Sequence, residues 1–346
     1  MTSPDNRRLR GGIAGCGFFG QIQLEAWRRI AGAEIVSACD PDLERARASA
    51  PRGYRSVAEM LERESLDFLD IAARPETHLE LVRAAAARRI PVICQKPMAP
   101  SWEEALAIVE TAGQAAIPLM IHENWRWQPW YRVVGDRIRR GDIGEPLAYQ
   151  FRSRRHDGAG AAPYPAQPYF RGMPRLLIHE TLVHNIDVAR FLFGDVRSVC
   201  ARLLRRNPAI AGEDQAWLLL THDVLAGWVD GHRYLDLAPD SPVLGDAVFE
   251  GDEGLLYVAP SGDVLLGGET IWKNTVTAGY RGDSVRATQE HFIDCLLNGR
   301  PFETAGREYL LKTVAVVEAA YRSARDQTLE TVTTPGVSPH SPTRAG

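Results

Sequence analysis

The sequence predicts an α/β protein with an N-terminal doubly wound parallel sheet and a C-terminal α/β domain that has a large, mostly antiparallel open sheet. Three observations predict this. Strand and helix patterns alternate up to residue 124, a glycine-rich turn joins the first strand to the first helix, and alternating apolar and polar runs follow from about residue 198. The 346 residues fit two domains of ordinary size, which we place at 1–124 and 125–332. We expect the Pro/Ser/Thr-rich stretch 333–346 to be a disordered tail.

The composition excludes several classes of protein. The net charge is −4 and no long basic run occurs, so we expect no nucleic acid and no acidic membrane surface as main partner. No stretch approaches the roughly 20 apolar residues of a membrane span, and the first ten residues lack the apolar core of a signal peptide. The five cysteines are scattered without a C-x-x-C pair. This indicates reduced thiols and a cytoplasmic enzyme.

The N-terminal domain is expected to consist of repeated strand–helix units. Strands are expected at residues 9–14, 34–39, 66–72, 90–94 and 118–122, and helices at 21–29, 56–63, 77–89 and 101–114. The last three helices begin with capping boxes, in which a Ser or Thr is followed three residues later by Glu. Units of this kind build a parallel sheet with helices on both faces.

The C-terminal domain has a different pattern. Helices are expected at residues 129–140, 176–193, 284–297 and 307–325, and strands at 147–152, 199–204, 216–221, 226–230, 247–250 and 255–258. The strands are separated by turn signals rather than by helices, which indicates a mostly antiparallel sheet. Residues 156–174 are rich in Gly, Ala, Pro and Tyr and are expected to form a long loop, a common kind of binding loop or lid.

The turn after the first strand reads G-x-G-x-x-G, from Gly15 through Gly17 to Gly20. A strand, this turn and a helix in that order indicate a Rossmann dinucleotide-binding entry. The first glycine permits the sharp turn, the second lets the backbone approach a pyrophosphate, and the third lets the helix pack close to the strand. We expect the whole turn to line the cofactor, with the two aromatic side chains between the glycines: Gly15, Gly17, Phe18, Phe19 and Gly20.

The choice of cofactor depends on Asp40, which follows the second strand twenty residues after Gly20. A carboxylate there bonds a ribose hydroxyl and repels a 2′-phosphate, so NAD is predicted over NADP. Arg45 and Arg47 lie close in sequence and keep NADP open as the less favoured cofactor.

Ligands of such sheets bind outside the carboxyl ends of the strands. This rule selects the segments 72–78, 95–97 and 122–126 beside the glycine turn. The further cofactor candidates are Arg74, Pro75, His78, Gln95, Lys96, Asn124 and Arg126. Lys96 and Arg126 are also candidates for substrate contact. A lysine after a strand is equally consistent with a solvated side chain, and the residue types leave both interpretations open.

A second dense group of polar residues occurs in the predicted helix 176–193. His179 and His184 are five positions apart, roughly 140° around an α-helix, so they do not form the zinc motif H-E-x-x-H and no metal site is expected. Glu180 and His184 are four apart and share a face. A carboxylate beside an imidazole suits a general base, with Asp187 also in reach. A simple helical ion pair is the equal alternative.

The long loop adds two substrate-binding candidates, Tyr169 and Arg171. Their side chains can hydrogen-bond to substrate hydroxyl groups. Ordinary surface positions are the alternative for each of them.

Taken in order, the glycine turn, Asp40, Arg74-Pro75 with His78, Lys96-Pro97 and the helix bearing Glu180, His184 and Asp187 resemble the glucose–fructose oxidoreductase/inositol dehydrogenase/rhizopine catabolism (Gfo/Idh/MocA) family. The resemblance covers about residues 8–330. It implies an N-terminal domain that binds NAD or NADP, and a C-terminal domain whose sheet pairs between subunits of a homodimer or homotetramer. It implies a small carbohydrate substrate.

The resemblance also implies residue roles. Lys96 matches the catalytic lysine of the family's E-K-P motif, His184 its catalytic histidine, and Glu180 the acidic partner of that histidine. Gln95 departs from the usual glutamate, Glu180 from the commoner aspartate, and Arg74 from a small polar residue. The segment 121–131 is most similar to that of sugar dehydrogenases of the D-apiose type.

Three hypotheses follow from the residues and the resemblance. The first is an NAD-dependent dehydrogenase that oxidises a hydroxyl of a sugar, polyol or glycoside. The second is a redox-neutral enzyme with tightly bound NAD, which acts on a glycoside through transient oxidation. The third is a non-catalytic nucleotide-binding protein, against which the combined presence of Lys96, Glu180 and His184 argues.

Overall fold

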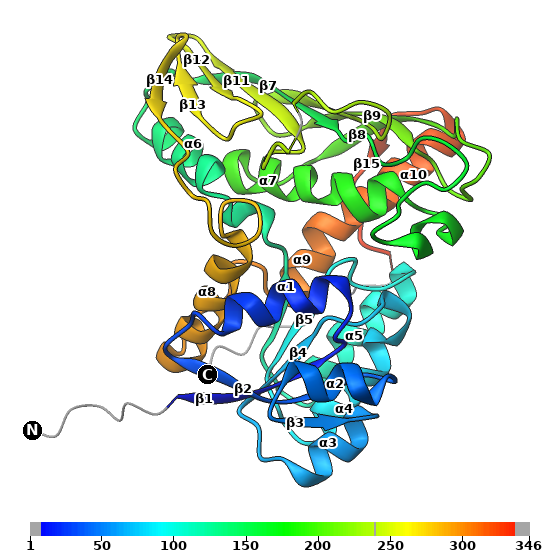
Figure 1. Cartoon of the computed structure of the whole chain (residues 1–346). Coiled ribbons are helices and arrows are strands. Elements are labelled where there is room, and N and C mark those ends of the chain that lie inside the picture. Colours follow the sequence, from blue (N-terminus) through cyan, green and yellow to red (C-terminus); the bar gives the residue numbers. More distant parts are fainter. Residues whose placement is uncertain (1–7, 239, 336–346) are drawn as a thin grey trace, which may run out of the picture.

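The computed structural model describes residues 8–238 and 240–335 and contains two lobes joined by several chain segments (Figure 1). The lower lobe of Figure 1 contains a six-stranded sheet in the order β3-β2-β1-β4-β5-β6, in which every pair is parallel. Its strands are β1 (Leu9–Ala14), β2 (Ala33–Cys39), β3 (Arg52–Tyr54), β4 (Phe68–Ile71), β5 (Val92–Gln95) and β6 (Leu119–His122). The doubly wound parallel sheet predicted from the sequence is confirmed.

Helices cover both faces of this sheet. They are α1 (Phe18–Trp27), α2 (Leu43–Ser49), α3 (Val57–Arg63), η1 (Pro75–Thr77), α4 (His78–Ala87) and α5 (Trp102–Gln114). Successive strand residues pack in opposite directions. Ile93 of β5 joins a core with Trp27 of α1, whereas Val92 and Cys94 join the larger core of the α3–α5 side. Buried apolar residues on both faces explain the continuous apolar runs of the sequence.

The upper lobe of Figure 1 contains a nine-stranded sheet in the order β14-β13-β12-β11-β7-β10-β9-β8-β15. All neighbouring strands are antiparallel except β7 and β10, as expected for a mostly antiparallel sheet. The strands are β7 (Pro146–Arg154), β8 (Ser198–Leu204), β9 (Gln215–Thr221), β10 (Ala226–His232), β11 (Gly245–Gly251), β12 (Leu255–Val258), β13 (Val264–Leu266), β14 (Glu269–Trp272) and β15 (Glu330–Thr331).

Helices cover one face of the nine-stranded sheet, and the other face is left open (Figure 1). The helical segments of this part of the chain are η2 (Trp125–Trp127), α6 (Pro129–Arg139), η3 (Pro168–Gly172), η4 (Leu177–Leu182), α7 (Val183–Phe193), α8 (Ser284–Asn298), α9 (Gly306–Tyr309), η5 (Leu310–Val314) and α10 (Ala315–Asp326). Two of them, η4 and η5, are π-helical turns that run into α7 and α10. No helix of the described residues is long and apolar enough to cross a membrane.

The chain returns to the first lobe after β14. Helix α8 packs on α1; Arg29, just after α1, forms an ion pair with Asp283, and Phe292 of α8 packs against Phe68 of β4. Thr304 and Ala305 then pair with the free edge of β6. A sequence boundary near residue 124 therefore does not separate the two cores, and we propose that residues 284–305 belong structurally to the first lobe.

The sequence patterns missed several short elements. Helix α2 and strand β3 were not predicted, nor were β13, β14 and β15. Each is brief, and short elements carry too few residues for a clear periodicity. The expected tail at 333–346 lies mostly outside the described residues; of its first residues, Pro335 accepts a hydrogen bond from Trp102.

Candidate active site

The glycine turn adopts the geometry that its spacing predicts. Gly15 has φ of 97°, a left-handed conformation that favours glycine. A Cβ on Gly20 would lie 2.2 Å from the carbonyl oxygen of Gly15, so the helix can approach the strand only without a side chain there. A Cβ on Gly17 would meet nothing within 4 Å. The helix N-terminus therefore presents accessible backbone beside Gly17, which fits a pyrophosphate.

Asp40 is buried at the carboxyl end of β2 and holds the turn in place. Its Oδ2 accepts from Cys16 N at 2.9 Å, and its Oδ1 accepts from Asp42 N at 2.9 Å. The guanidinium of Arg45 lies 3.7 Å from the same Oδ1. The carboxylate is thus adjacent to the turn, where a ribose hydroxyl would reach it. Arg47 is instead paired with Glu44.

Two buried side chains at the ends of β5 and β6 contain nitrogen atoms that have no hydrogen-bond partner among the described residues. Gln95 uses its Oε1 to accept from Lys96 N at 2.8 Å, while its Nε2 has no hydrogen-bond partner. Neither ring nitrogen of His122 has one, and its ring packs edge-on against Phe19. Orphaned donors and acceptors of this kind call for a polar ligand. Their position beyond the glycine turn fits the carboxamide end of a nicotinamide, so the residues present suit NAD.

Lys96 and Glu180 form an ion pair between the lobes. Lys96 Nζ donates to the backbone oxygen and to Oε1 of Glu180, each at 2.7 Å. Oε2 of Glu180 accepts from Thr181, whose hydroxyl oxygen accepts from Arg233. Although burial opposes it, the positive charges of Lys96 and Arg233 hold the pKa of Glu180 at about 2. The carboxylate is therefore charged and keeps a cation beside it.

The acidic partner of His184 is Glu123, which corrects the pairing expected from the sequence. Nδ1 of His184 lies 2.5 Å from Oε1 of Glu123, the residue after β6. Glu180 is turned toward Lys96 instead, because an ammonium attracts a carboxylate more strongly than a neutral imidazole does. Glu180 also lies in the π-helical turn η4, so its spacing from His184 does not have pure α-helical geometry. Strand-end position had indicated segment 122–126, but not Glu123 within it.

Trp125 and Tyr309 complete the surroundings of this pair. The Trp125 ring stacks on the His184 ring at 4.5 Å with an angle of 2° between the planes. Tyr309 donates its hydroxyl to Oε2 of Glu123 at 3.1 Å. The imidazole is thus fixed both in its plane and at Nδ1, which leaves Nε2 as the nitrogen that can serve a ligand.

Arg126 and Asp187 also differ from expectation. Arg126 donates from Nε and Nη2 to the two oxygens of Asp187 at 2.7 and 2.8 Å, and from Nη1 to the backbone oxygen of Glu303. Asp187 therefore does not bond His184. All three nitrogens of the Arg126 guanidinium donate to protein acceptors, so the structure does not support Arg126 as a cofactor or substrate contact. Fork geometry favours such a bidentate pair over a contact with a neutral ligand.

Three other cofactor candidates are buried within the protein. His78 is fully buried, with Nδ1 at 3.0 Å from the Met98 oxygen and Nε2 at 3.1 Å from the Ala73 oxygen, so it joins two strand-end segments rather than facing a ligand. Asn124 donates to the Ser284 hydroxyl at 2.8 Å and ties β6 to α8. Pro75, also buried, begins η1. These corrections share one cause. Polar residues at strand ends can hydrogen-bond to neighbouring loops of the protein as well as to ligands, and position alone does not distinguish the two.

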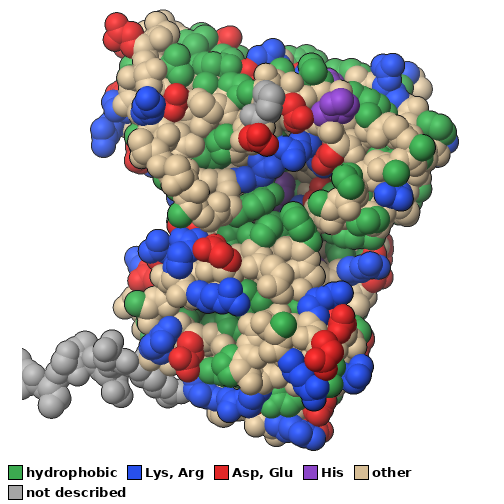
Figure 2. All heavy atoms as spheres, viewed as in Figure 1, with side chains coloured by type: hydrophobic (Ala, Val, Ile, Leu, Met, Phe, Trp, Pro, Cys, Tyr) green, Lys and Arg blue, Asp and Glu red, His purple; other side chains and the backbone are tan. Residues whose placement is uncertain are grey.

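Arg74 and Tyr169 meet across the two lobes. The exposed Arg74 guanidinium lies 5.1 Å from the centre of the Tyr169 ring. Arg171 donates to the backbone oxygen of Pro163 and so is held within its own loop. Figure 2 shows that this face of the molecule is hollowed where the lobes meet, with basic and histidine side chains visible there. Tyr169 remains a candidate through its contact with Arg74, and Arg171 contributes to the shape of the loop.

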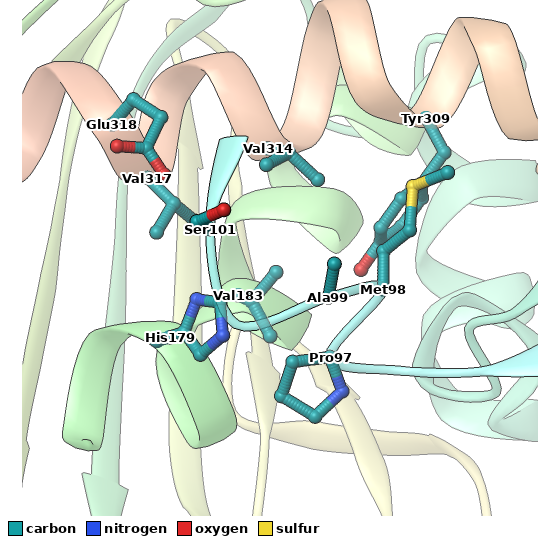
Figure 3. A pocket seen from close by; sticks show the side chains of 10 residues that line it. All are labelled: Pro97, Met98, Ala99, Ser101, His179, Val183, Tyr309, Val314, Val317 and Glu318. Atoms are coloured by element: carbon teal, nitrogen blue, oxygen red, sulfur yellow. The ribbon is translucent and has the colours of Figure 1, made fainter. Parts of the chain in front are cut away.

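A small pocket lies behind the Lys96 segment (Figure 3). Pro97, Met98 and Ala99 form one wall, and His179 and Tyr309 project toward it from the C-terminal part of the chain. Burial lowers the pKa of His179 to about 3, with Arg175 and Lys96 acting in the same direction. His179 therefore belongs to this packing layer and not with His184. The described residues contain no cluster of three His, Cys, Asp or Glu side chains able to hold a metal ion.

Comparisons with known proteins agree with the fold and the motifs. Residues 9–122 match the model of the oxidoreductase family with an NAD-binding Rossmann fold, GFO_IDH_MocA, and residues 131–233 match the GFO/IDH/MocA C-terminal domain. The chain belongs to the Gfo/Idh/MocA oxidoreductase family. As expected from its sequence, this oxidoreductase is an NAD-binding α/β enzyme.

Among similar proteins, a D-apiose dehydrogenase of Paraburkholderia graminis is 39% identical, over 94% of this chain and 90% of that protein. A D-apiose dehydrogenase of Rhizobium rhizogenes is 36% identical, over 91% of this chain and 95% of that protein. A solved structure of an oxidoreductase from Agrobacterium radiobacter in complex with NAD⁺, L-tartaric acid and magnesium has a TM-score of 0.86 at 33% identity, over 94% of this chain and 99% of that one.

Proposed function

We propose that this Gfo/Idh/MocA oxidoreductase oxidises a hydroxyl group of a sugar, with His184 as general base and Lys96 as the cation that stabilises the developing oxyanion. One observation carries the proposal. Lys96, which follows β5, is paired with a charged carboxylate, and the imidazole of His184 on α7 is held at Nδ1 by Glu123, which follows β6. This combination supports removal of a proton and a hydride from the same alcohol.

Bound NAD would supply the hydride acceptor. The alcohol oxygen lies near both groups of the chain in this proposal. Nε2 of His184 takes the hydroxyl proton, and Lys96 Nζ donates a hydrogen bond to the same oxygen as it becomes a carbonyl. Because Lys96 Nζ donates to the charged Glu180 carboxylate, the lysine suits the donor role and the histidine the role of base. The carbon gives its hydrogen with the electron pair, so the products are a carbonyl compound, NADH and a proton.

We propose D-apiose as the first substrate to test, because two full-length relatives carry the name D-apiose dehydrogenase. The test is a panel of aldoses, including D-apiose, together with myo-inositol and levoglucosan, followed by NADH absorbance. The expected result is sugar-dependent NADH formation by the wild type and its loss in His184→Ala and Lys96→Ala. Unchanged rates in both variants would refute the assigned roles. Cofactor content of the purified protein distinguishes a dehydrogenase from a redox-neutral enzyme that retains its NAD.

We further propose a homo-oligomer formed through the open face of the nine-stranded sheet. Trp228 of β10 is 49% exposed on this sheet, and partly exposed Trp217 and Leu219 lie on the neighbouring strand β9. Exposed apolar patches of this kind commonly mark protein interfaces. Light scattering should give a dimer or tetramer, and Trp228→Glu should shift it toward monomer.

The five free cysteines, four of them buried, support the proposal of a reducing, cytoplasmic location.

A further inference from the structure

Glu123 is a carboxylate that the sequence motifs of the active site do not include, yet it touches the proposed base directly. It is fully buried, and each of its oxygens has defined donors. Oε1 lies 2.5 Å from His184 Nδ1 and also accepts from Trp125 N at 3.0 Å; Oε2 accepts from the Tyr309 hydroxyl at 3.1 Å. Two of the three partners come from other elements, α7 and α9, that meet only in the folded protein.

We propose that Glu123 and Tyr309 are positioning residues that set the basicity of His184, with Glu123 holding its Nδ1–H tautomer and Tyr309 stabilising the charged carboxylate. This proposal rests on the proposed function of His184 as base. Glu180, at the position expected for the acidic partner, serves Lys96 instead. The site thus uses two carboxylates with different partners: Glu180 pairs with Lys96, and Glu123 pairs with His184.

The protons of the pair can be counted explicitly. With one proton, Glu123 is a carboxylate, the imidazole is neutral with its hydrogen on Nδ1, and Nε2 has a free lone pair. When Nε2 takes the proton of a substrate hydroxyl, the pair holds two protons, and Glu123 faces an imidazolium or receives its Nδ1 proton. No other reactant is needed. The one-proton form is active, and the two-proton form cannot accept a proton from substrate.

The electrostatics place the uptake of the second proton by the Glu123–His184 pair near neutral pH. Burial raises the pKa of Glu123 to about 7, opposed by the Trp125 amide and the cations Lys96 and Arg126, and burial lowers the pKa of His184. Charged and titratable groups face the pair from every neighbouring element: Lys96 after β5, His122 on β6, Arg126 in η2, Glu180 in η4, Asp187 on α7, Arg281 before α8 and Tyr309 on α9. At low pH the pair therefore holds two protons and activity is lost.

Two substitutions should move the acid limb of the rate profile in opposite directions. Glu123→Gln removes the charge that favours protonation of the imidazole, so kcat should fall about tenfold or more and the acid limb should move to lower pH. Tyr309→Phe removes a hydrogen bond to the charged carboxylate, so the acid limb should move to higher pH by about half a unit or more. Tyr131→Phe, at a buried tyrosine that packs on Phe151, should leave the limb unchanged. Acid limbs that stay in place in both test variants, or move in the same direction, would overturn the proposal.

A measurement without substrate separates this inference from the proposed function. Histidine ¹⁵N resonances of the wild type, assigned with His184→Asn, should report the Nδ1–H tautomer above pH 8 and a change near pH 7. The change should occur at higher pH in Tyr309→Phe. If no sugar is oxidised but this shift is observed, the function fails and the role of Glu123 stands. A His184 signal that is insensitive to both Glu123→Gln and Tyr309→Phe would refute the role, whether or not sugars are oxidised.

Discussion

Lys96 Nζ donates to two oxygens of one residue, the backbone oxygen and Oε1 of Glu180, each at 2.7 Å. An ammonium group has three hydrogens, so among the described residues one hydrogen of Lys96 is left for an oxygen in the cleft. Glu180 therefore positions the Lys96 ammonium group through both contacts. This geometry connects the Rossmann lobe to the π-helical turn η4, which runs into α7, because the two residues lie on different lobes.

Replacing Lys96 should affect chemistry more than binding. Lys96→Ala removes one donor to the developing oxyanion, and such losses cost about 10²–10³-fold in kcat. Steady-state kinetics on a responding sugar measure the effect, with Lys273→Ala as the control at an exposed lysine after β14. A kcat for Lys96→Ala within twofold of the control would contradict a role in the reaction.

Glu180→Gln should lower stability at neutral pH. Removing one partner of a buried ion pair leaves Lys96 uncompensated, at a cost on the order of 3 kcal/mol in the free energy of unfolding. The pKa of Glu180 is about 2 in the folded protein, below the ordinary value of about 4.3, so its contribution is complete above about pH 5 and is lost as pH falls toward 2. Urea unfolding across this range tests the sign. Glu290→Gln, in a surface pair with Arg286, should cost less than about 1 kcal/mol.

The second and third glycines of the turn, Gly17 and Gly20, should respond differently to substitution by alanine. Gly17→Ala adds a Cβ in open space, so the melting temperature should be unchanged while NAD⁺ binds about tenfold more weakly, because the Cβ occupies the path of the pyrophosphate. Gly20→Ala places its Cβ 2.2 Å from the Gly15 oxygen and should lower stability by about 1–3 kcal/mol. Calorimetric titration and thermal melts compare them. Equal loss of stability in both variants would show that Gly17 is needed for folding rather than for the cofactor.

Asp40→Asn should shift the cofactor preference toward NADP. The amide retains an acceptor for Cys16 N but removes the charge that repels a 2′-phosphate, while Arg45 stays nearby. The ratio of the Kd values for NADP⁺ and NAD⁺ should fall about tenfold, equivalent to about 1.4 kcal/mol. Asp42→Asn is the matched control, because Asn still caps α2 and Asp42 is not at the end of β2. A wild-type preference for NADP⁺ would contradict the assigned role of Asp40.

The sequence was sufficient for the class of both sheets and for the glycine turn of the Rossmann fold. Glycine spacing and apolar periodicity are local properties, so the geometry at Gly15 and Gly20 and the parallel class of the first sheet could be predicted from neighbours in the chain. The partner of His184 could not, because Glu123 is brought to it by the docking of segment 122–126 on α7. Arg126 reaches Asp187 in the same docking, one turn further along. Spacing within a helix predicts which side chains of that helix are close together. It does not predict that Lys96 and Glu123, from other segments, contact Glu180 and His184.

Helix α8 makes the folding of the first lobe depend on a segment that lies far along the chain. Phe292 lies between Phe68 of the first lobe and Phe302, and Gln289 donates to the backbone oxygen of Gln23 in α1. A fragment ending near residue 124 would carry every cofactor motif yet expose the apolar surface that α8 covers. Ribosomal synthesis must therefore continue through α8, at residues 284–298, before the nucleotide-binding lobe can bury this face.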